Sequence, residues 1–323
     1  MRLIFLATGS VAVPSIRAIA AAKRDELLAV VTQPPRPAGR KHTLTQCPAA
    51  LAAQELGLPL LQPENVNDND EKKTDALSAI RALAPDLLIV ADYGQYLGAP
   101  LRSIPRLGAI NIHPSLLPKY RGATPLQRTL LNHDTIGGVS ILYVTKLMDA
   151  GDILEQVSTP VADDETCPQL SARLAELGAE RLLTVLDRFR AADAPLPGTP
   201  QDESQVVPAP LLSKTDGQVR WDRPAQAIYD QWRAFLPWPG CTALLPDNTP
   251  FKLLELAPPS PELATTAPSA PPGTVLAADG PAILVATATT PLRLLLVQPA
   301  GRPPMPPSAL LAGRRLSLSS LLP

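Results

Sequence analysis

The chain has few cysteines, and it lacks a long apolar run. Its three cysteines, Cys47, Cys167 and Cys241, lie far apart among 323 residues and form no CxxC pair. That number and spacing support neither a zinc ribbon nor a disulfide framework, and three reduced thiols suit the cytosol. Because no run of 18 apolar residues occurs, we expect no membrane span. These absences predict a cytoplasmic protein with no membrane partner and no metal site.

The first residues imitate a signal peptide, since an apolar run follows Arg2 and an Ala-rich stretch follows that run. Gly9, Ser10 and Pro14 interrupt the apolar run, however. We therefore interpret the segment as a strand over residues 3–7 and a helix that opens near Pro14, rather than as a leader of a secreted protein.

Aromatic residues and net charge are also low. With four Phe, five Tyr and three Trp, the chain is unlike proteins that hold single strands by stacking bases on aromatic rings. Its 29 basic and 30 acidic residues give a net charge of −1. No global basic field therefore indicates a nucleic-acid or membrane partner.

Proline, by contrast, is abundant and unevenly placed. Of the 39 prolines, 15 lie in residues 1–193 and 24 in the remaining 130, although about 5% of residues is usual. This shift predicts a first domain over 1–193, a proline-rich linker over 194–210 and a second domain over 211–323.

Residues 1–193 alternate apolar runs with helical patterns. Expected strands cover 3–7, 27–31, 86–91, 108–113, 138–144 and 153–157, and expected helices cover 48–56, 70–84 and 167–190. Strands separated by helices of this length predict βαβ units and a mostly parallel sheet. Their continuous apolar character indicates a sheet that is buried on both faces. The first domain is therefore expected to be α/β.

The second domain has a different pattern. A helix is expected over 225–235, and short strands are expected over 241–245, 251–256, 274–276, 282–286 and 292–297. Short strands at near-regular spacing predict a small β-barrel.

The segment GAINIHPSLLPKYRGATPLQ, residues 108–127, carries the most chemistry. Asn111 and His113 are two apart on an expected strand, so both side chains point to one face. Pro114 ends the strand and places them at its C-terminal edge, where open α/β sheets bind ligands. Lys119 and Arg121 follow closely and add positive charge.

A carboxylate is needed to orient the imidazole and to stabilise its charged form. The candidate is Asp149 in LMDAGDIL, and Asp152 is a competitor. With no nucleophilic Ser or Cys and no metal set, Asn, His and Asp favour direct transfer over a covalent intermediate. Asn111 can donate to an oxyanion, and His113 can accept a proton from an attacking amine.

These motifs resemble the folate-dependent formyltransferases, whose pattern N-x-H-x-SLLPxxRG with a later D-x-GD is matched at 111–122 and 149–152. Within that family the chain is most similar to the branch that acts on methionyl-tRNA. The likeness extends to FLATGSVAVPSI (5–16), VVTQPPRPAGRKHTLT (30–45), PDLLIVADYGQYL (85–97) and the segment 211–240.

The resemblance implies a Rossmann-like N-terminal domain and a C-terminal barrel similar to an OB-fold. It also implies transfer of formyl from 10-formyltetrahydrofolate to the α-amino group of methionyl-initiator tRNA, for translation initiation. The matched positions assign catalysis to Asn111, His113 and Asp149, folate binding to Ser115, Leu116, Leu117 and Pro118, and tRNA contact to Arg36, Arg40 and Lys41. No metal is implied, and we expect a monomer.

Two features depart from the family pattern. The first loop contains ATGS where Gly-Thr-Pro/Ser is usual, and residues 194–323 carry nine basic and nine acidic residues. A neutral second domain predicts a small, local footprint on tRNA.

Three alternatives have different signatures. A formyltransferase for an amino-sugar nucleotide would share Asn111, His113 and Asp149 but would not need the 30–45 loop. A non-enzymatic RNA-binding relative would not need those three residues. A Rossmann dehydrogenase needs GxGxxG after the first strand, and the chain has ATGSVA there.

Overall fold

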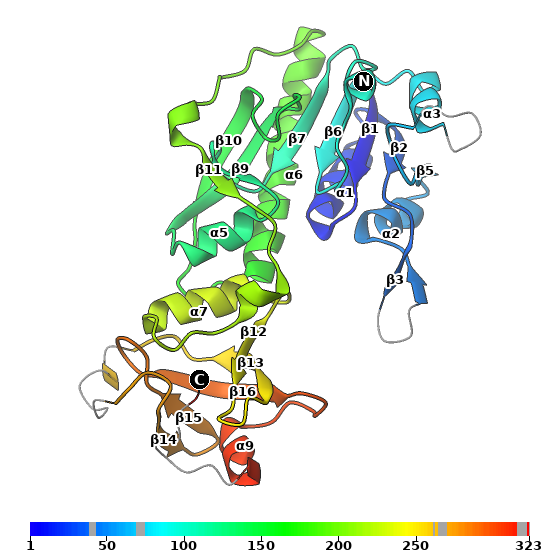
Figure 1. The fold of residues 1–323 in the computed structure, drawn as a ribbon. Coiled ribbons are helices and arrows are strands. Elements are labelled where there is room, and N and C mark those ends of the chain that lie inside the picture. The colour runs from blue at the N-terminus through cyan, green and yellow to red at the C-terminus, as the bar shows by residue number, and fades with distance from the viewer. Residues whose placement is uncertain (39–42, 69–74, 261, 264–269, 315–321, 323) are drawn as a thin grey trace. The chain divides into compact units, whose positions relative to one another are not determined.

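The computed structural model describes residues 1–323 apart from 39–42, 69–74, 261, 264–269, 315–321 and 323 (Figure 1). The chain forms two compact units. The first comprises Met1–Pro125, Ile136–Pro160 and Gln169–Ala209, and the second comprises Leu126–Thr135, Val161–Pro168 and Pro210–Pro323.

The first unit is built on a seven-stranded sheet in the order β10-β9-β7-β6-β1-β2-β5. Its strands are β1 (Arg2–Ala7), β2 (Glu26–Val31), β5 (Leu60–Leu61), β6 (Leu87–Ala91), β7 (Ala109–His113), β9 (Ile136–Tyr143) and β10 (Ile153–Pro160). The first five are parallel, whereas β9 and β10 are antiparallel. The predicted mostly parallel α/β sheet is confirmed, with an antiparallel pair at one edge.

Helices cover the apolar strands, as their continuous burial requires. They are α1 (Val13–Ala22), α2 (Pro48–Glu55), α3 (Ala76–Ala82), α4 (Ala99–Arg102) and α6 (Cys167–Ala192). Helix α5 (Pro125–Leu131) belongs, apart from Pro125, to the second unit. On one face, Leu77 and Ile80 of α3 join Ile4 and Leu88 in a single core.

Helix α6 covers one face of β7, so the side chains of a site on this strand must lie on the other face. A Cβ built on Gly178 of α6 would lie 3.0 Å from Ile112 Cγ2 and 3.5 Å from Val139 Cγ1. The helix therefore packs closely on the face of β7 to which Ile112 points. Since side chains alternate along a strand, Asn111 and His113 point to the opposite face.

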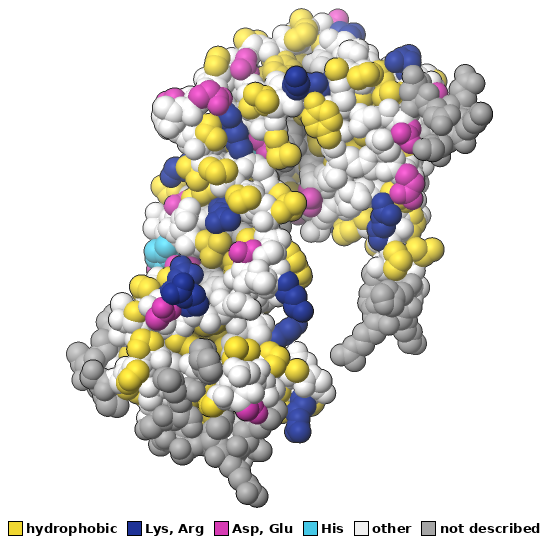
Figure 2. Space-filling model, viewed as in Figure 1, with side chains coloured by type: hydrophobic (Ala, Val, Ile, Leu, Met, Phe, Trp, Pro, Cys, Tyr) yellow, Lys and Arg dark blue, Asp and Glu magenta, His cyan; other side chains and the backbone are white. Residues whose placement is uncertain are grey.

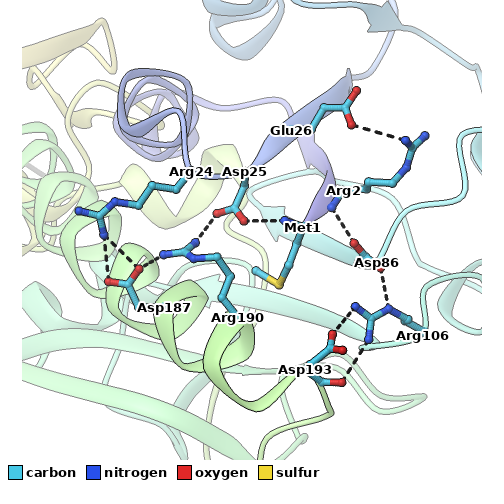
Figure 3. Close-up of polar contacts among 10 residues, drawn as sticks. All are labelled: Met1, Arg2, Arg24, Asp25, Glu26, Asp86, Arg106, Asp187, Arg190 and Asp193. Atoms are coloured by element: carbon cyan, nitrogen blue, oxygen red, sulfur yellow. Dashed lines mark hydrogen bonds and ion pairs between the residues drawn. The ribbon is translucent and has the colours of Figure 1, made fainter.

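Charged side chains of both signs are interspersed with apolar ones over the face shown in Figure 2. Ion pairs connect the ends of α6, β1 and β2 in the first unit (Figure 3). Asp25 Oδ1 lies 3.0 Å from the Met1 nitrogen, and Asp25 Oδ2 lies 2.5 Å from Arg190 Nη1. Arg106 bridges Asp86 and Asp193 at 2.6 Å each. These contacts fix the last turns of α6 against the start of the sheet.

Two small sheets complete the first unit. The hairpin β3 (Arg36–Ala38) and β4 (Thr43–Thr45) is antiparallel, while β8 (Lys119–Gly122) and β11 (Val207–Ala209) pair in parallel. Strand β11 and the 3₁₀ turn Glu203–Gln205 lie in the proline-rich segment 194–210. In addition, Thr199 and Ile153 exchange two backbone hydrogen bonds of 2.8 and 2.9 Å. This segment is thus hydrogen-bonded to the first unit.

The second unit contains a five-stranded antiparallel sheet in the order β12-β13-β16-β15-β14. Its elements are α7 (Ala225–Ala234), β12 (Cys241–Leu244), β13 (Pro250–Leu256), β14 (Val275–Asp279), β15 (Ala282–Val285), β16 (Leu292–Pro299) and α9 (Pro307–Arg314). The expected helix and five strands are therefore present, within a few residues of the predicted bounds.

A buried ion pair anchors α7 within this unit. Arg233 Nε lies 2.7 Å from Asp230 Oδ1, and the two side chains are 1% and 3% exposed. Arg233 also donates to the carbonyls of Leu130, Ala162 and Glu165. Asp230 Oδ2 also lies 3.1 Å from His133 Nδ1.

Among the described residues, no helix is both long enough and apolar enough to cross a bilayer.

Candidate active site

The last three residues of β7 are Asn111, Ile112 and His113. His113 is buried, with 5% of the residue exposed, and Asn111 is partly buried. Both side chains lie on the face opposite α6, as the alternation along the strand predicts. The strand therefore presents an amide and an imidazole side by side at its C-terminal edge.

The imidazole of His113 is oriented by a backbone carbonyl. Its Nε2 lies 2.9 Å from the oxygen of Tyr120. A carbonyl oxygen only accepts, so Nε2 carries the hydrogen, and Nδ1 of the neutral ring keeps its lone pair. Nδ1 faces Asp149 Oδ2 at 3.7 Å, which is beyond hydrogen-bond length. His113 is thus arranged to accept a proton at Nδ1.

Asp149 lies in the loop between β9 and β10, and its carboxylate is shared between two donors. Oδ1 accepts from Asn111 Nδ2 at 3.2 Å, and Oδ2 accepts from the backbone N–H of Gly122 at 2.9 Å. The side chain is 11% exposed. A proton taken up by His113 would therefore create a cation next to a largely buried carboxylate, which stabilises it.

Asp152, the competing carboxylate, is exposed, and its backbone carbonyl accepts from Tyr143 N at 3.0 Å. Asp149 is thus the carboxylate that the loop directs to Asn111 and His113. The amide of Asn111 uses one of its two hydrogens on Asp149, and the second is available to an oxyanion.

The stretch Ser115–Pro118 is fixed by hydrogen bonds to the Ser115 hydroxyl and to the backbone of Leu117. Ser115 and Leu117 are buried. The Ser115 hydroxyl donates to Lys119 O at 2.7 Å, and Leu117 N donates to Ser140 Oγ at 3.1 Å. Gln156 Nε2 donates to Leu117 O at 3.0 Å. The side chains of Leu116 and Pro118 remain partly exposed.

Of the three basic residues expected to contact tRNA, the structure describes only Arg36. Arg40 and Lys41 lie outside the described residues. Arg36 begins strand β3 and pairs with Glu64 at 3.2 Å, with both side chains largely exposed. Arg121, whose charge the sequence places beside the site, is held by Gln201 and Glu203. Its guanidinium is therefore hydrogen-bonded to neighbouring side chains, and the Arg121 side chain is only 12% exposed to solvent.

The ATGS turn after β1 is tied to the end of β6. Thr8 N and Gly9 N both donate to Asp92 O, at 2.9 and 3.2 Å. A Cβ on Gly9 would lie 1.6 Å from Asp92 Oδ2, so a larger residue there would require the Asp92 carboxylate to move. Burial raises the pKa of the Asp92 carboxyl.

Three contributors to the site were not predicted from the sequence as hydrogen-bonding groups. They are the carbonyl of Tyr120, the N–H of Gly122 and the side chain of Gln201, which donates to the carbonyls of Asp149 and Gly151. Two are backbone groups, and the third lies about fifty residues from its partners. Within the part of the chain that the structure describes, no three His, Cys, Asp or Glu side chains cluster as metal ligands.

Comparisons with known proteins show which family the chain resembles. Residues 1–186 match the family model "Formyl transferase", and residues 211–315 match "Formyl transferase, C-terminal domain". The methionyl-tRNA formyltransferase of Herpetosiphon aurantiacus is 41% identical over 305 residues, covering 94% of this chain and 95% of the relative. The enzyme of that name from Roseiflexus sp. is 39% identical and covers 98% and 94%.

A solved structure shows a similar fold. WlaRD, a sugar 3N-formyl transferase crystallised in the presence of dTDP and 5-N-formyl-THF, aligns with a TM-score of 0.65 at 13% identity. The alignment covers 94% of this chain and 99% of that one.

Proposed function

The chain belongs to the formyl transferase family, and we infer that it transfers a formyl group to the α-amino group of methionyl-initiator tRNA for translation initiation. The single observation that carries this inference is the near-complete match to methionyl-tRNA formyltransferases at 39–41% identity. The Asn111, His113 and Asp149 cluster supplies groups suited to that chemistry.

We propose the following roles for the three side chains. The amine attacks the formyl carbon, and the carbonyl oxygen becomes an oxyanion that accepts the free hydrogen of Asn111 Nδ2. His113 Nδ1 takes the proton that the attacking nitrogen loses. Asp149, 3.7 Å away, stabilises the imidazolium. An α-amine has a pKa near 8, so a useful neutral fraction is present at pH 7.

The tetrahedral intermediate then collapses. The bond between the formyl carbon and the folate nitrogen breaks, and His113 returns its proton to that nitrogen. The proton count balances, because the amine loses one hydrogen and the leaving folate gains one. These roles require no metal.

Enzymes of this family use folate, and the formyl donor proposed here is 10-formyltetrahydrofolate. We propose that Ser115, Leu116, Leu117 and Pro118 contribute to its site. Supporting this, Leu116 and Pro118 offer partly exposed apolar surface three and five residues after His113. The hydrogen bonds to Ser115 and Leu117 give that loop a fixed shape.

For tRNA, we propose a small contact through Arg36, Arg40 and Lys41. Arg36 is largely exposed, and its pairing with Glu64 is of the surface kind that a phosphate can replace. We further propose a catalytic domain over 1–193, a linker over 194–210 and a tRNA-binding domain over 211–323. We expect the enzyme to act in the cytoplasm, where charged tRNA is made, and as a monomer.

Formyl transfer assays test this function directly. The purified protein is given 10-formyltetrahydrofolate with charged initiator methionyl-tRNA, and controls replace the tRNA by its uncharged form or by an amino-sugar nucleotide. We expect formylation of the charged tRNA alone. Formylation of the sugar without formylation of methionyl-tRNA would overturn the proposal in favour of the amino-sugar alternative.

A further inference from the structure

The side chain of Gln201 closes the loop that carries Asp149. Its Nε2 donates to the carbonyl oxygens of Asp149 and Gly151, at 2.8 Å each. Both hydrogens of the amide are thus directed at the backbone on either side of Ala150. The Asp149 backbone has φ +51°, a left-handed conformation that costs most L-residues energy, and the two hydrogen bonds from Gln201 support the loop in that conformation.

Gln201 is itself fixed by Arg121. The guanidinium donates through Nε and Nη2 to Gln201 Oε1, at 3.0 and 2.8 Å, and it also pairs with Glu203 at 2.8 Å. The Arg121 side chain is 12% exposed. Because the planar guanidinium of Arg121 holds the amide oxygen of Gln201 with two hydrogen bonds, the NH₂ group of the same amide is fixed in its direction toward residues 149–151.

The backbone on both sides of Gln201 is also bound to the site. Before it, Thr199 exchanges two hydrogen bonds with Ile153. After it, Ala209 O accepts from Ala123 N at 2.8 Å, and β11 pairs with β8, which ends at Gly122. Gly122 N is the second donor to the Asp149 carboxylate. One segment, 199–209, therefore restrains both loops that determine where the carboxylate points.

We propose that Gln201 is a positioning residue for formyl transfer: it holds the Asp149 backbone so that the carboxylate stays directed at Asn111 and His113. This proposal rests on the proposed function, because it assigns Asp149 a part in the same reaction. In this proposal Gln201 acts through the loop that carries Asp149, to which its hydrogen bonds are made. The proline-rich segment thereby becomes part of the catalytic apparatus rather than only a connection.

The test compares Gln201→Glu with Gln201→Ala and with the matched control Gln205→Glu. Glutamate keeps the length and the acceptor for Arg121 but replaces the donating NH₂ with an oxygen that repels the two carbonyls. Gln205 is exposed in the same segment and bonds Asp202, outside the site. We expect both Gln201 variants to lower kcat about tenfold to 100-fold, while KM for each substrate stays within about threefold. Gln205→Glu is expected to match the parent enzyme.

A second readout does not depend on turnover. The chain has only three histidines, so the ring ¹⁵N signals of His113 are readily assigned. We expect the Nδ1 signal to shift in Gln201→Glu, because the carboxylate opposite it moves, and to stay in place in Gln205→Glu. Gln201→Glu turning over within about twofold of the parent, or an unmoved Nδ1 signal, would overturn the proposal. A parent enzyme that does not formylate methionyl-tRNA would refute the proposed function, while the ring signal would still decide whether Gln201 positions Asp149.

Discussion

His113 and Asp149 face each other across 3.7 Å, yet the hydrogen bonds of each go elsewhere. The ring is held by Tyr120 O, and the carboxylate is held by Asn111 and the N–H of Gly122. The sequence suggests that an aspartate holds the imidazole. In the structure a backbone carbonyl orients the ring, and the carboxylate is kept nearby for the moment when the ring becomes charged.

Asp149→Asn removes the charge of the side chain with little change in its size. The remaining oxygen can accept from Gly122 N, but the new NH₂ cannot accept from Asn111 Nδ2, and the imidazolium loses its counter-charge. We expect kcat to fall about 10²-fold to 10³-fold with little change in the melting temperature, measured by formyl transfer and by thermal unfolding. A variant that retains more than a third of the parent kcat would contradict the electrostatic role.

At Gly122, both the backbone conformation and the close approach of the adjacent strand leave no room for a side chain. Its φ is +122°, and a Cβ there would lie 2.6 Å from Ala209 O on the adjacent strand. We expect Gly122→Ala to lower the free energy of unfolding by about 1–3 kcal/mol and to reduce turnover, because its N–H holds Asp149. Denaturant titration and the formyl transfer assay measure the two effects.

Gly57 provides the matched control for that substitution. It also has a positive φ, +64°, but a Cβ at this position would have no atom within 4 Å to meet. Gly57→Ala is expected to cost about 1 kcal/mol from conformation alone and to leave turnover unchanged. Equal losses of stability in the two variants would show that the contact with Ala209 is unimportant.

The Asp230 and Arg233 pair predicts a large stability effect in the second unit. Arg233→Met would leave Asp230, which is 3% exposed, without its main counter-charge. We expect a loss of about 3–5 kcal/mol in the free energy of unfolding. In the exposed pair of Arg220 and Asp222, Arg220→Met is expected to leave the melting temperature unchanged. Similar unfolding curves for the two variants would contradict the importance of burial.

Asp86 predicts how stability responds to acid. Burial alone would raise the pKa of its carboxyl, but hydrogen bonds from Arg2 N and from the Arg106 side chain outweigh burial and lower it. Because the folded state then binds the proton less tightly than the unfolded state, Asp86 stabilises the fold above the pKa of the unfolded chain, near 4. This contribution is lost as the pH falls below that value.

Unfolding of the parent and Asp86→Asn from pH 2 to pH 7 measures this contribution. We expect the difference in unfolding free energy to be constant between pH 5 and pH 7 and to shrink toward pH 2. A difference that does not vary with pH would show that the ionised form of Asp86 has no special stabilisation.

Sequence patterning predicted much of the architecture because strands such as β1 and β6 are buried on both faces and therefore continuously apolar. It also placed Asn111 and His113 on one face, since alternation along a strand is a local property. It did not predict that β9 and β10 run antiparallel, or that residues 207–209 form a strand. Pairing direction depends on long-range contacts, and Pro208 argues against a strand.

Arg121 illustrates the same limit. Its sequence position beside the site indicates a free positive charge, but the partners that determine its role, Gln201 and Glu203, lie about eighty residues away. The pairing of β8 with β11, together with the hydrogen bonds between Thr199 and Ile153, brings them together.

The most direct test of the catalytic roles is the single-turnover rate of formyl transfer by His113→Gln. Glutamine can still donate to Tyr120 O, but it offers no nitrogen that takes up a proton at neutral pH. With 10-formyltetrahydrofolate and methionyl-tRNA both saturating, we expect a rate about 10²-fold to 10⁴-fold below that of the parent, with folate affinity within about threefold. A single-turnover rate within about twofold of the parent would contradict the assignment of His113 as the group that moves the proton.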